Sequence, residues 1–470
     1  MSVNKDITSR DVDFGKWYSD IVTKAGLVDY SSVKGSMIIA PLGYAIWEEM
    51  VHTLDGMFKA TGHQNVQMPM FIPESLLNVE KEHVEGFAPE VAWVTYGGLE
   101  KLEERLCVRP TSETLFCDYY KKIIKSYRDL PKLYNQWCTI VRWEKTTKPF
   151  LRSREILWQE GHTMHATAEE AREETLRMLH VYEDFQRNYL AIPVIVGRKT
   201  EKEKFAGALE TYSLEAMMYD GVALQNGTSH YFGDGFAKAF GIQYLNKENK
   251  LVTPFQTSWG TTTRMIGALI MVHSDDRGLV LPPKIAPFKT VIIPIGNVGE
   301  TIDKLESELK DKGITYKVDL SDKTPGYKFA DAEVKGYPVR IVVGERDLLN
   351  DQITLVRRDT LEEKKVSVKD TLKELETMLL VMQTDMYNRA LERRNKMIYE
   401  AHNYEEFRDI ATNKPGFIKA NWCGDVACEN KVKDDFSMKS RCLINDEEVG
   451  ETCAICGKKA KYRLYFGRQY

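Results

Sequence analysis

The sequence predicts an α+β protein: a large N-terminal unit with an antiparallel sheet, then a smaller α/β unit, then a cysteine-rich tail. Three observations predict it. Several strand-like runs of the first unit lie too close together in the chain for a helical crossover, which is typical of antiparallel pairing. From about residue 290, strand-like and helix-like runs alternate, as in α/β sheets. Five of the eight cysteines crowd into residues 423–456.

The composition is that of a large globular chain. Its 470 residues and 43% hydrophobic content can bury large cores. The net charge of −4 argues against binding nucleic acid through bulk basicity, although a local basic groove is compatible with it. The polar start lacks a signal-peptide core, and no run approaches the roughly 18 apolar residues of a membrane span. We therefore expect a soluble, cytoplasmic protein without a membrane partner.

The first unit is expected to span residues 1–277. Residues 44–60 place apolar side chains on one helical face and lead into NVQMPMFIP, a β-rich run closed by prolines. Thr167, with Glu170 three residues later, has the capping-box pattern that predicts a helix start. The runs QWCTIVRW, GVALQNGTS and TPFQTSW are predicted as strands of the sheet.

The second half of the chain divides into a linker and two further units. Residues 278–289 are proline-rich and aperiodic, which predicts the linker. Residues 290–384 alternate strands with helices. The first of these helices is expected to turn Ile302, Leu305 and Leu309 inward and to stop at Gly313. Charged helical sequence covers residues 371–399, and the tail unit is assigned to residues 385–470.

Three segments of the first unit combine arginine with small or acidic residues. They are RWEKTTKPFLRSREILWQEGH, CVRPTSETLF and TSWGTTTRMIGALIMV. The chain has no GxxxxGK[ST] loop, so any phosphate chemistry must use arginine side chains, whose planar fork suits phosphate oxygens. Taken singly, each segment also fits a solvated charged hairpin or an exposed helix cap. Their occurrence together favours a binding site.

These segments resemble the motifs of the class II aminoacyl-tRNA synthetases. RWE looks like motif 2, WGTTTR like motif 3, and the helix of residues 44–60 like the dimer-forming motif 1. RPTSE, REILWQEGH and QNGTSH resemble prolyl-tRNA synthetases of the type shared by archaea, eukaryotes and some bacteria. The resemblance covers essentially the whole chain. It implies a class II catalytic domain, an α/β anticodon-binding domain and a small zinc-binding C-terminal domain.

The resemblance also implies a reaction and its ATP site. L-proline would be activated by ATP with Mg²⁺ and then passed to the 3′ end of tRNA(Pro). Arg142 and Arg264 would be the catalytic residues, stabilising the charge that builds at the α-phosphorus as pyrophosphate leaves. Glu144 would accept from adenine, and Gln225 would lie beside Mg²⁺. The residues expected at ATP are Arg142, Glu144, Arg152, Gln225, Thr228, Thr262 and Arg264.

The proline pocket is expected to join a carboxylate to an aromatic slot. Glu113 would hold the secondary ammonium, and rings would enclose the pyrrolidine, which discriminates weakly against alanine. Too few residues separate His162 from Gln225 for an inserted editing domain. The spacing of His162 and His165 does not match a metalloprotease motif. The residues expected at proline are Thr111, Glu113, Arg142, Trp158, His162, Phe205 and His230.

Two further sites are predicted outside the first unit. Glu333 and Arg340 match the positions expected to read the guanines of the anticodon, with a surface ion pair as the alternative. The thiolates of Cys423, Cys428, Cys453 and Cys456 form two close pairs, a suitable tetrahedral set for structural Zn²⁺. Cys442 is the expected non-ligand, and its replacing one of the four remains open.

Three other functions compete with proline–tRNA ligation. A threonyl- or seryl-specific relative is disfavoured by RPTSE with REILWQEGH. A catalytically silent synthetase-like tRNA-binding regulatory protein would be expected to lose a phosphate-binding arginine, whereas Arg142, Arg152 and Arg264 are present. An adenylating enzyme that does not use tRNA would not need the α/β unit. A homodimeric proline–tRNA ligase is the favoured hypothesis.

Overall fold

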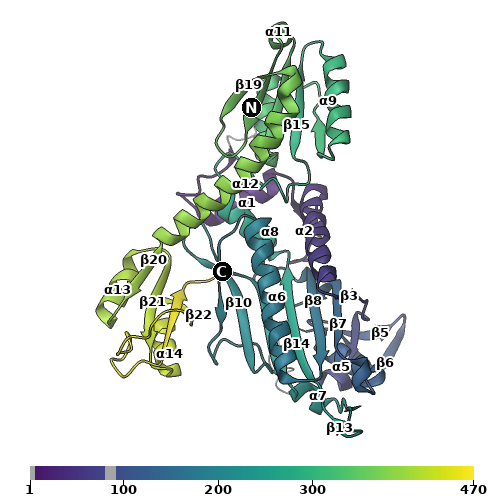
Figure 1. The fold of residues 1–470 in the computed structure, drawn as a ribbon, viewed down its shortest axis with the longest axis vertical. Helices are drawn as coiled ribbons and strands as arrows, with labels where there is room; N and C mark the ends of the chain where they lie inside the picture. The colour runs from purple at the N-terminus through teal and green to yellow at the C-terminus, as the bar shows by residue number, and fades with distance from the viewer. Residues whose placement is uncertain (1–5, 80–90) are drawn as a thin grey trace.

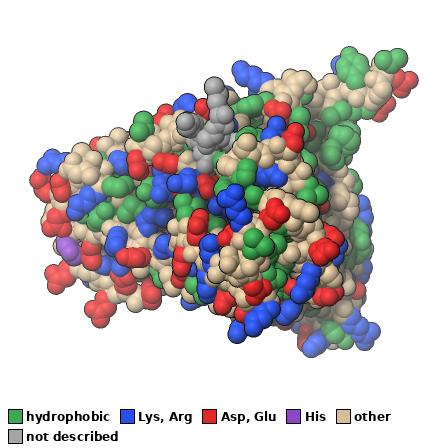
Figure 2. Space-filling view, turned by 90° about the horizontal axis from the view of Figure 1, so that it is seen from above, with side chains coloured by type: hydrophobic (Ala, Val, Ile, Leu, Met, Phe, Trp, Pro, Cys, Tyr) green, Lys and Arg blue, Asp and Glu red, His purple; other side chains and the backbone are tan. Residues whose placement is uncertain are grey.

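The computed structural model describes residues 6–79 and 91–470. The start of the polar N-terminal stretch, residues 1–5, lies outside the described residues. Three units are visible in Figure 1: the first at the lower right, the second at the top and the third at the lower left. The predicted α+β architecture is confirmed. Basic and acidic side chains are interspersed on the face shown in Figure 2, in keeping with the near-neutral net charge.

A seven-stranded sheet in the order β3-β7-β8-β14-β11-β10-β9 forms the centre of the first unit. Every neighbouring pair is antiparallel except β3 with β7, so the predicted antiparallel sheet is confirmed. The strands are β3 (Gln64–Asn65), β7 (Lys132–Val141), β8 (Glu155–His165), β9 (Val194–Arg198), β10 (Glu210–Met217), β11 (Ala223–Gly233) and β14 (Phe255–Thr262).

Helices α6 and α8 pack on β11 and β14. The hydroxyl of Thr167 accepts from the Glu170 backbone amide at 3.2 Å and starts α6 as the capping pattern predicted. Helix α2 begins at Pro41, slightly before the predicted residue 44. The helices of this unit are α1 (Phe14–Lys24), α2 (Pro41–Ala60), α3 (Glu74–Leu77), α5 (Glu113–Ile123), the 3₁₀ helix η3 (Tyr127–Asp129), α6 (Ala168–Asn188), α7 (Gly235–Ala239) and α8 (Arg264–His273).

The run NVQMPMFIP forms less strand than predicted, because residues 66–70 are irregular. Side chains satisfy part of its backbone: Met68 N donates to the Gln136 side chain at 3.0 Å, and the Arg109 side chain donates to Met68 O at 2.8 Å. Pro69 has no amide to offer a neighbouring strand. The remaining strands of the unit are β1 (Val28–Tyr30), β2 (Met37–Ile39), β4 (Phe71–Pro73), β5 (Ala92–Gly97), β6 (Glu100–Val108), β12 (Tyr244–Leu245) and β13 (Leu251–Val252).

The second unit is an α/β fold around a mixed five-stranded sheet in the order β16-β15-β17-β18-β19. The inward face predicted for its first helix is confirmed, since Ile302, Leu305 and Leu309 are buried. The strands are β15 (Thr290–Ile295), β16 (Tyr316–Val318), β17 (Val339–Gly344), β18 (Gln352–Arg357) and β19 (Glu363–Ser367). The helices are α9 (Gly299–Asp311), α10 (Pro325–Lys335), α11 (Glu345–Leu348) and the 3₁₀ helix η4 (Val368–Asp370).

Helix α12 (Thr371–Lys396) runs from the second unit to the third, and the predicted boundary at residues 384 and 385 falls inside it (Figure 1). The third unit has a four-stranded sheet in the order β20-β21-β23-β22. Its last residues return to the first unit, where Ala223 N donates to Arg468 O at 2.7 Å and Tyr470 N donates to Ala223 O at 3.1 Å. Its elements are β20 (Ile398–Ala401), α13 (Tyr404–Asn413), β21 (Phe417–Trp422), α14 (Val426–Phe436), β22 (Lys439–Ile444) and β23 (Tyr462–Gly467).

Candidate active site

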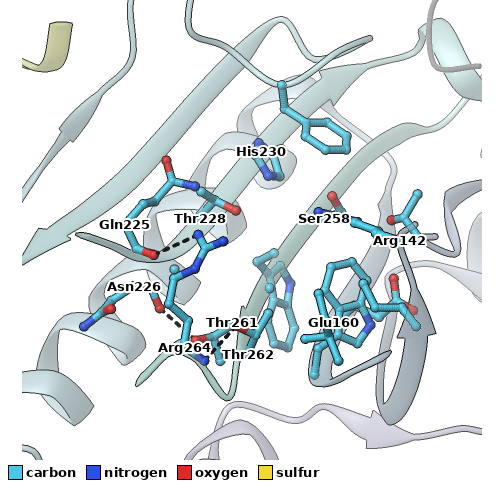
Figure 3. Close-up of a pocket in the computed structure, with 18 of the residues that line it drawn as sticks. Arg142, Glu160, Gln225, Asn226, Thr228, His230, Ser258, Thr261, Thr262 and Arg264 are labelled. Carbon is cyan, nitrogen blue, oxygen red and sulfur yellow. Dashed lines mark hydrogen bonds between the residues drawn. The ribbon is translucent and has the colours of Figure 1, made fainter. Parts of the chain in front are cut away.

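A cavity of about 440 Å³ opens on the seven-stranded sheet. Strands β8, β11 and β14 supply half of its lining residues, and the rest include the segments around Thr111, Arg142 and Phe205. Figure 3 shows Glu160, His230 and Ser258 from these three strands around the cavity. Its size suits a small ligand or cofactor. The arginines converge near one part of the cavity and the aromatic rings near another, so its two parts differ in chemistry.

Arg264 is the central cation of the arginine-lined part. It is the first residue of α8, and its backbone N donates to Thr262 Oγ1 at 3.0 Å. Its guanidinium reaches Gln225 O at 3.4 Å (Figure 3). Burial, together with the charges of Arg142 and Arg152, lowers the pKa of Arg264 to about 10. Crowded cations of this kind favour an anionic ligand.

Arg142 lies at the junction of the two parts. Its Nε donates to Pro110 O at 3.1 Å, and its guanidinium carbon lies 5.2 Å from the centre of the Trp158 ring. The sequence predicted that Arg142 and Glu144 lie on a strand, but β7 ends at Val141. The Arg142 backbone still donates to Arg154 O at 2.9 Å, which keeps the two sides of the hairpin together.

Two residues predicted at ATP do not line the cavity. Glu144 and Arg152 lie on the hairpin beyond it and face each other, with Arg152 Nη1 3.7 Å from Glu144 Oε2. Arg152 is exposed. The other five line the cavity as a group: Arg142, Gln225, Thr228, Thr262 and Arg264.

All seven residues predicted at proline line the cavity. The Thr111 hydroxyl donates to the Glu113 carboxylate, and Ser258 Oγ lies 3.4 Å from the same carboxylate. The rings of Phe205 and His230 lie 4.6 Å apart. Burial, with a smaller contribution from the nearby His162, lowers the pKa of His230 to about 3, so this ring is neutral at neutral pH.

Glu160 is a central residue that the sequence reasoning missed. Its carboxylate is buried and accepts from Ser112 Oγ at 2.5 Å, Gln136 Nε2 at 2.6 Å and His162 Nε2 at 2.8 Å. Burial alone would lower the pKa of His162, but the hydrogen bond and charge of Glu160, with the charge of Glu113, raise it. The alternation in QEGH was the available signal, because residues two apart on a strand share a face.

Glu113, Glu160 and His162 place their ligand atoms within 4.8 Å of one another, close enough to be considered as a metal site. Protein hydrogen bonds already occupy this group: Ser112, Gln136 and His162 contact Glu160, and Thr111 contacts Glu113. The arrangement suits an anionic hydrogen-bond network that faces a cationic ligand.

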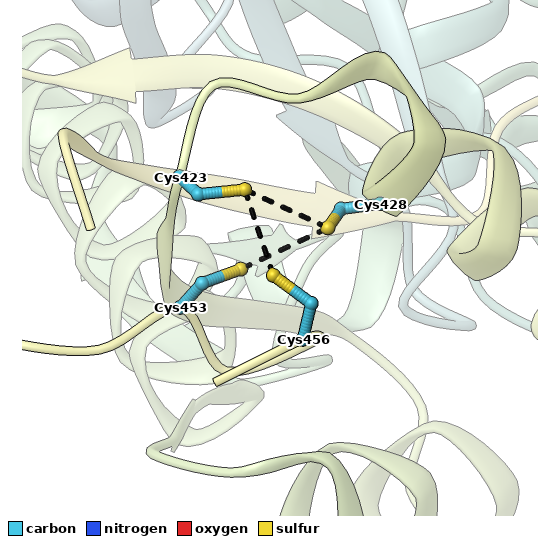
Figure 4. Close-up of side chains that lie close together, drawn as sticks. All are labelled: Cys423, Cys428, Cys453 and Cys456. Atoms are coloured by element: carbon cyan, nitrogen blue, oxygen red, sulfur yellow. Dashed lines mark hydrogen bonds between the residues drawn. The ribbon is translucent and has the colours of Figure 1, made fainter. Parts of the chain in front are cut away.

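The four predicted cysteines come together in the third unit (Figure 4). Cys423 Sγ lies 3.7 Å from the sulfurs of Cys428 and Cys456, and Cys428 Sγ lies 4.0 Å from that of Cys453. Tetrahedral zinc with Zn–S bonds near 2.3 Å requires sulfurs about 3.8 Å apart, so the thiols fit this ion. Cys442 lies elsewhere, on β22 against Ser213.

Glu333 and Arg340 are adjacent in the second unit. Arg340 Nη1 donates to Glu333 Oε1 at 3.3 Å, and Arg277 donates to the other oxygen at 3.1 Å. Glu333 and Arg340 therefore form an ion pair with each other, as the alternative held, although both side chains are largely buried. A separate groove nearby is lined by basic and aromatic residues that include Lys323, Tyr327, Lys328, Lys335 and Tyr337.

Comparison with known proteins agrees with this architecture. Residues 93–273 match the tRNA synthetase class II core domain (G, H, P, S and T), and residues 289–378 match an anticodon binding domain. With the antiparallel sheet and its arginine-lined cavity, these matches define a class II aminoacyl-tRNA synthetase. Residues 404–470 match the prolyl-tRNA synthetase C-terminal family. The chain belongs to the prolyl-tRNA synthetase family.

Relatives resemble the chain over its whole length. A proline–tRNA ligase of Lachnoclostridium phytofermentans is 60% identical over 469 residues, covering 99% of this chain and 98% of that protein. Proline–tRNA ligase 2 of Bacillus cereus is 56% identical with the same coverage. The crystal structure of prolyl-tRNA synthetase from Cryptosporidium parvum, complexed with halofuginone and AMPPNP, superposes with a TM-score of 0.95 at 38% identity and covers 100% of both chains.

Proposed function

We propose that this chain ligates proline to tRNA in two steps. A proline carboxylate oxygen attacks the α-phosphorus of ATP, and the bond to the pyrophosphate oxygen breaks, giving prolyl-adenylate and pyrophosphate. A hydroxyl at the tRNA 3′ end then attacks the prolyl carbonyl and releases AMP. The observation that carries this proposal is that one cavity joins the half-buried Arg142 and Arg264 to a carboxylate and an aromatic wall.

The arginines account for the activation step. Arg142 lies between the two parts of the cavity and would hold the proline carboxylate against the α-phosphate. Arg264 would face adenine and the outer phosphates, with Gln225, Thr228 and Thr262 completing the nucleotide site. Mg²⁺ bound to ATP would neutralise charge on the phosphates. Positioning and charge stabilisation of this kind are the main sources of rate in phosphoryl chemistry.

Glu144 and Arg152 are proposed to leave their mutual ion pair and turn toward ATP when it binds. Their mutual pairing on the hairpin leaves both side chains beside the cavity entrance, and the ion pair is partly exposed. An exposed pair of this kind is weak and can exchange partners at little cost. Glu144 would then accept from adenine, and Arg152 would meet the outer phosphates.

The aromatic part is proposed to bind proline. Glu113 would accept from the secondary ammonium, with Thr111 orienting the carboxylate. The rings of Trp158, His162, Phe205 and His230 would enclose the pyrrolidine. The neutral state of His230 suits this role, because an uncharged ring does not repel the ammonium.

The remaining sites support tRNA recognition and folding. Glu333 and Arg340 are proposed to read anticodon bases by exchanging their mutual ion pair for base edges. Cys423, Cys428, Cys453 and Cys456 are proposed to hold a structural zinc ion, supported by their sulfur spacing. The domains are proposed as catalytic (1–277), linker (278–289), anticodon-binding (290–384) and zinc-binding (385–470).

The finer classification is also proposed. The chain would belong to the type shared by archaea, eukaryotes and some bacteria, supported by its whole-chain likeness to the Cryptosporidium parvum enzyme. It would lack an editing domain, since residues between His162 and Gln225 form the end of β8, α6, β9, β10 and the start of β11.

We place the enzyme in the cytoplasm as a homodimer. Tyr44 on α2, Phe71 on β4 and Tyr96 on β5 expose large apolar surfaces that a partner subunit could cover. No helix in residues 6–79 or 91–470 has both the length and the apolar character that a bilayer crossing requires.

Proline-dependent exchange of pyrophosphate into ATP tests the function. Wild-type protein should catalyse exchange with proline, and Arg142→Ala should lose about 10²- to 10³-fold or more, because it removes transition-state charge stabilisation. Lys145→Ala, on the exposed hairpin, is the matched control and should retain exchange. Exchange with threonine but not proline would overturn the substrate, and absence of exchange with any amino acid would overturn the reaction.

A further inference from the structure

The segment 199–209 forms one wall of the aromatic part of the cavity. It connects β9 to β10 without a helix or strand, and it brings Glu203 and Phe205 to the lining. The Phe205 backbone amide donates to Thr211 Oγ1 at 2.9 Å, and the same hydroxyl lies 3.0 Å from His230 Nδ1. The placement of this segment therefore sets how Phe205 faces the pocket.

Residues of α14 in the third unit hold this wall. Thr200 Oγ1 donates to Glu429 Oε1 at 2.8 Å, and Lys202 Nζ donates to Asn430 Oδ1 at 2.7 Å. Ser440 donates to the same Glu429 oxygen. Thr200 and Glu429 are 3% and 2% exposed, so this contact is shielded from water. Glu429 follows Cys428 directly, so the cysteine cluster anchors the turn that carries it.

Charged side chains of β22 also contact the segment 199–209. The Glu203 carboxylate lies 3.6 Å from Lys439 Nζ and 3.8 Å from Arg441 Nη2. Arg441 is 1% exposed and also faces Glu215 at 3.5 Å, which pairs with Lys199 at 2.7 Å. Burial would raise the pKa of Glu215, but the charges of Lys199 and Arg441 lower it to about 2.

The backbones of the two units also approach closely. A Cβ atom added to Gly197 on β9 would lie 2.7 Å from Leu443 O and 2.8 Å from Cys442 Cβ. Strand β22 therefore rests directly on β9, next to the start of the wall. The polar contacts above belong to a packed interface and not to a pair of surfaces that meet through solvent.

We propose that Glu429 and Lys439 are positioning residues for proline recognition, acting through segment 199–205. They would keep Phe205 in its binding geometry before proline arrives. Ordering a loop costs conformational entropy, and a ligand as small as proline makes too few contacts to offset that cost for several residues. The third unit would supply this order in advance. The inference rests on the proposed binding of proline in the aromatic part of the cavity.

Substitution of Glu429 in the full chain tests the proposal. In the exchange assay, Glu429→Ala should raise the KM for proline about five- to tenfold, the effect of losing one typical hydrogen bond. The KM for ATP should stay within about twofold, because the hydrogen bonds of Glu429 go to Thr200 and Ser440 and not to the arginines of the cavity. Glu429→Gln keeps an oxygen acceptor for Thr200 and should restore most of the proline affinity. Equilibrium binding of labelled proline provides a readout independent of turnover.

Lys431→Ala is the matched control on α14. Its ammonium pairs with Asp435 at 2.7 Å on the exposed side of the helix, away from the first unit. This variant should leave both KM values unchanged. An equal rise of the proline and ATP KM values in Glu429→Ala, or an unchanged proline KM in that folded variant, overturns the proposal.

If Glu429→Ala does not fold, Thr200→Val tests the same contact from its other side. It removes the hydroxyl with little change of shape and should raise the proline KM alone. Combined with Glu429→Ala, it should add little, because both changes break the same contact. An unchanged proline KM in Thr200→Val overturns the inference. Wild-type protein without proline-dependent exchange would instead overturn the proposed function, so the two failures are distinguishable.

Discussion

Glu160 links the charge of the proline pocket to the stability of the fold. Its pKa is lowered although burial alone would raise it, because His162, Ser112 and Gln136 donate to its carboxylate. His162 in turn has a raised pKa. The two groups therefore stabilise each other's charged forms inside the protein, and removing one leaves the other buried without its partner.

Glu160→Gln should destabilise the protein most in mildly acidic solution. The His162 contribution is full below its ordinary pKa of 6.5 and is lost as pH rises through the higher folded pKa. The Glu160 contribution is present above 4.5 and is lost as pH falls through the lower folded pKa. Between pH 4.5 and pH 6.5, thermal unfolding should show that Glu160→Gln lowers the free energy of unfolding by about 3 kcal/mol. This loss should shrink in alkaline solution. A loss of equal size at about pH 5.5 and pH 9 would contradict this pairing.

At the scale of elements, the pairing of β8 with β14 depends on one glycine. Gly161 lies opposite Trp259, and an added Cβ would lie 2.1 Å from the indole ring. Trp259 is 1% exposed and packs against Phe58 and Tyr182, so it has little room to move. Glu160 and His162 flank Gly161 on β8, so strain at Gly161 reaches the cavity.

Gly161→Ala should destabilise the protein by about 1–3 kcal/mol, the range for overpacking a core. The matched control is Gly56→Ala in the interior of α2, where nothing lies within 4 Å of the added Cβ. That control should stabilise the protein by about 0.5–1 kcal/mol. Urea unfolding of both variants measures the difference, and two changes of the same sign would refute the packing argument.

Metal analysis tests the cysteine cluster of the third unit. Cys453→Ser should lower the zinc content of the purified protein and its unfolding temperature, because one thiolate of the tetrahedral set is lost. Cys442→Ser is the matched control and should retain zinc, since Cys442 lies on β22 outside the cluster. Zinc loss in the control but not in Cys453→Ser would reassign the ligand.

Sequence patterns predicted the elements whose hydrogen bonds are local. The periodic face of α9, the Thr167 cap and the position of Arg264 at the start of α8 all follow from neighbouring residues. The irregular residues 66–70 could not be predicted, because their backbone partners are the distant Gln136 and Arg109 side chains. Two of the donors to Glu160, Ser112 and Gln136, are also distant in the chain, and only His162 on the same strand gave a local signal.

At the scale of the molecule, the second unit contacts the first through charged groups. Arg358 forms two hydrogen bonds with Asp275, at 2.7 and 2.8 Å, and Arg277 reaches Glu333 at 3.1 Å. Glu333 thus touches the boundary between the units while belonging to neither the arginine-lined nor the aromatic part of the cavity. Activation of proline and recognition of tRNA should therefore be separable by substitution.

Glu333→Ala should leave pyrophosphate exchange within about twofold of wild type. Charging of tRNA(Pro) should fall about tenfold or more, because a carboxylate that accepts from a base is lost. Lys310→Ala on the exposed side of α9 is the control and should affect neither reaction. Paired exchange and charging assays measure the split, and undiminished charging would show that Glu333 does not read the anticodon.

The contact of Thr200 with Glu429 also has a consequence for biosynthesis. The two residues are 229 positions apart in the chain. At ribosomal rates of about 5–20 residues per second, on the order of 10–50 s pass between the synthesis of Thr200 and that of Glu429. Strands β8, β11 and β14, which supply half of the lining residues of the cavity, are all made before this delay ends. A nascent chain would thus contain the arginines of the cavity well before the contacts that hold the Phe205 wall can form.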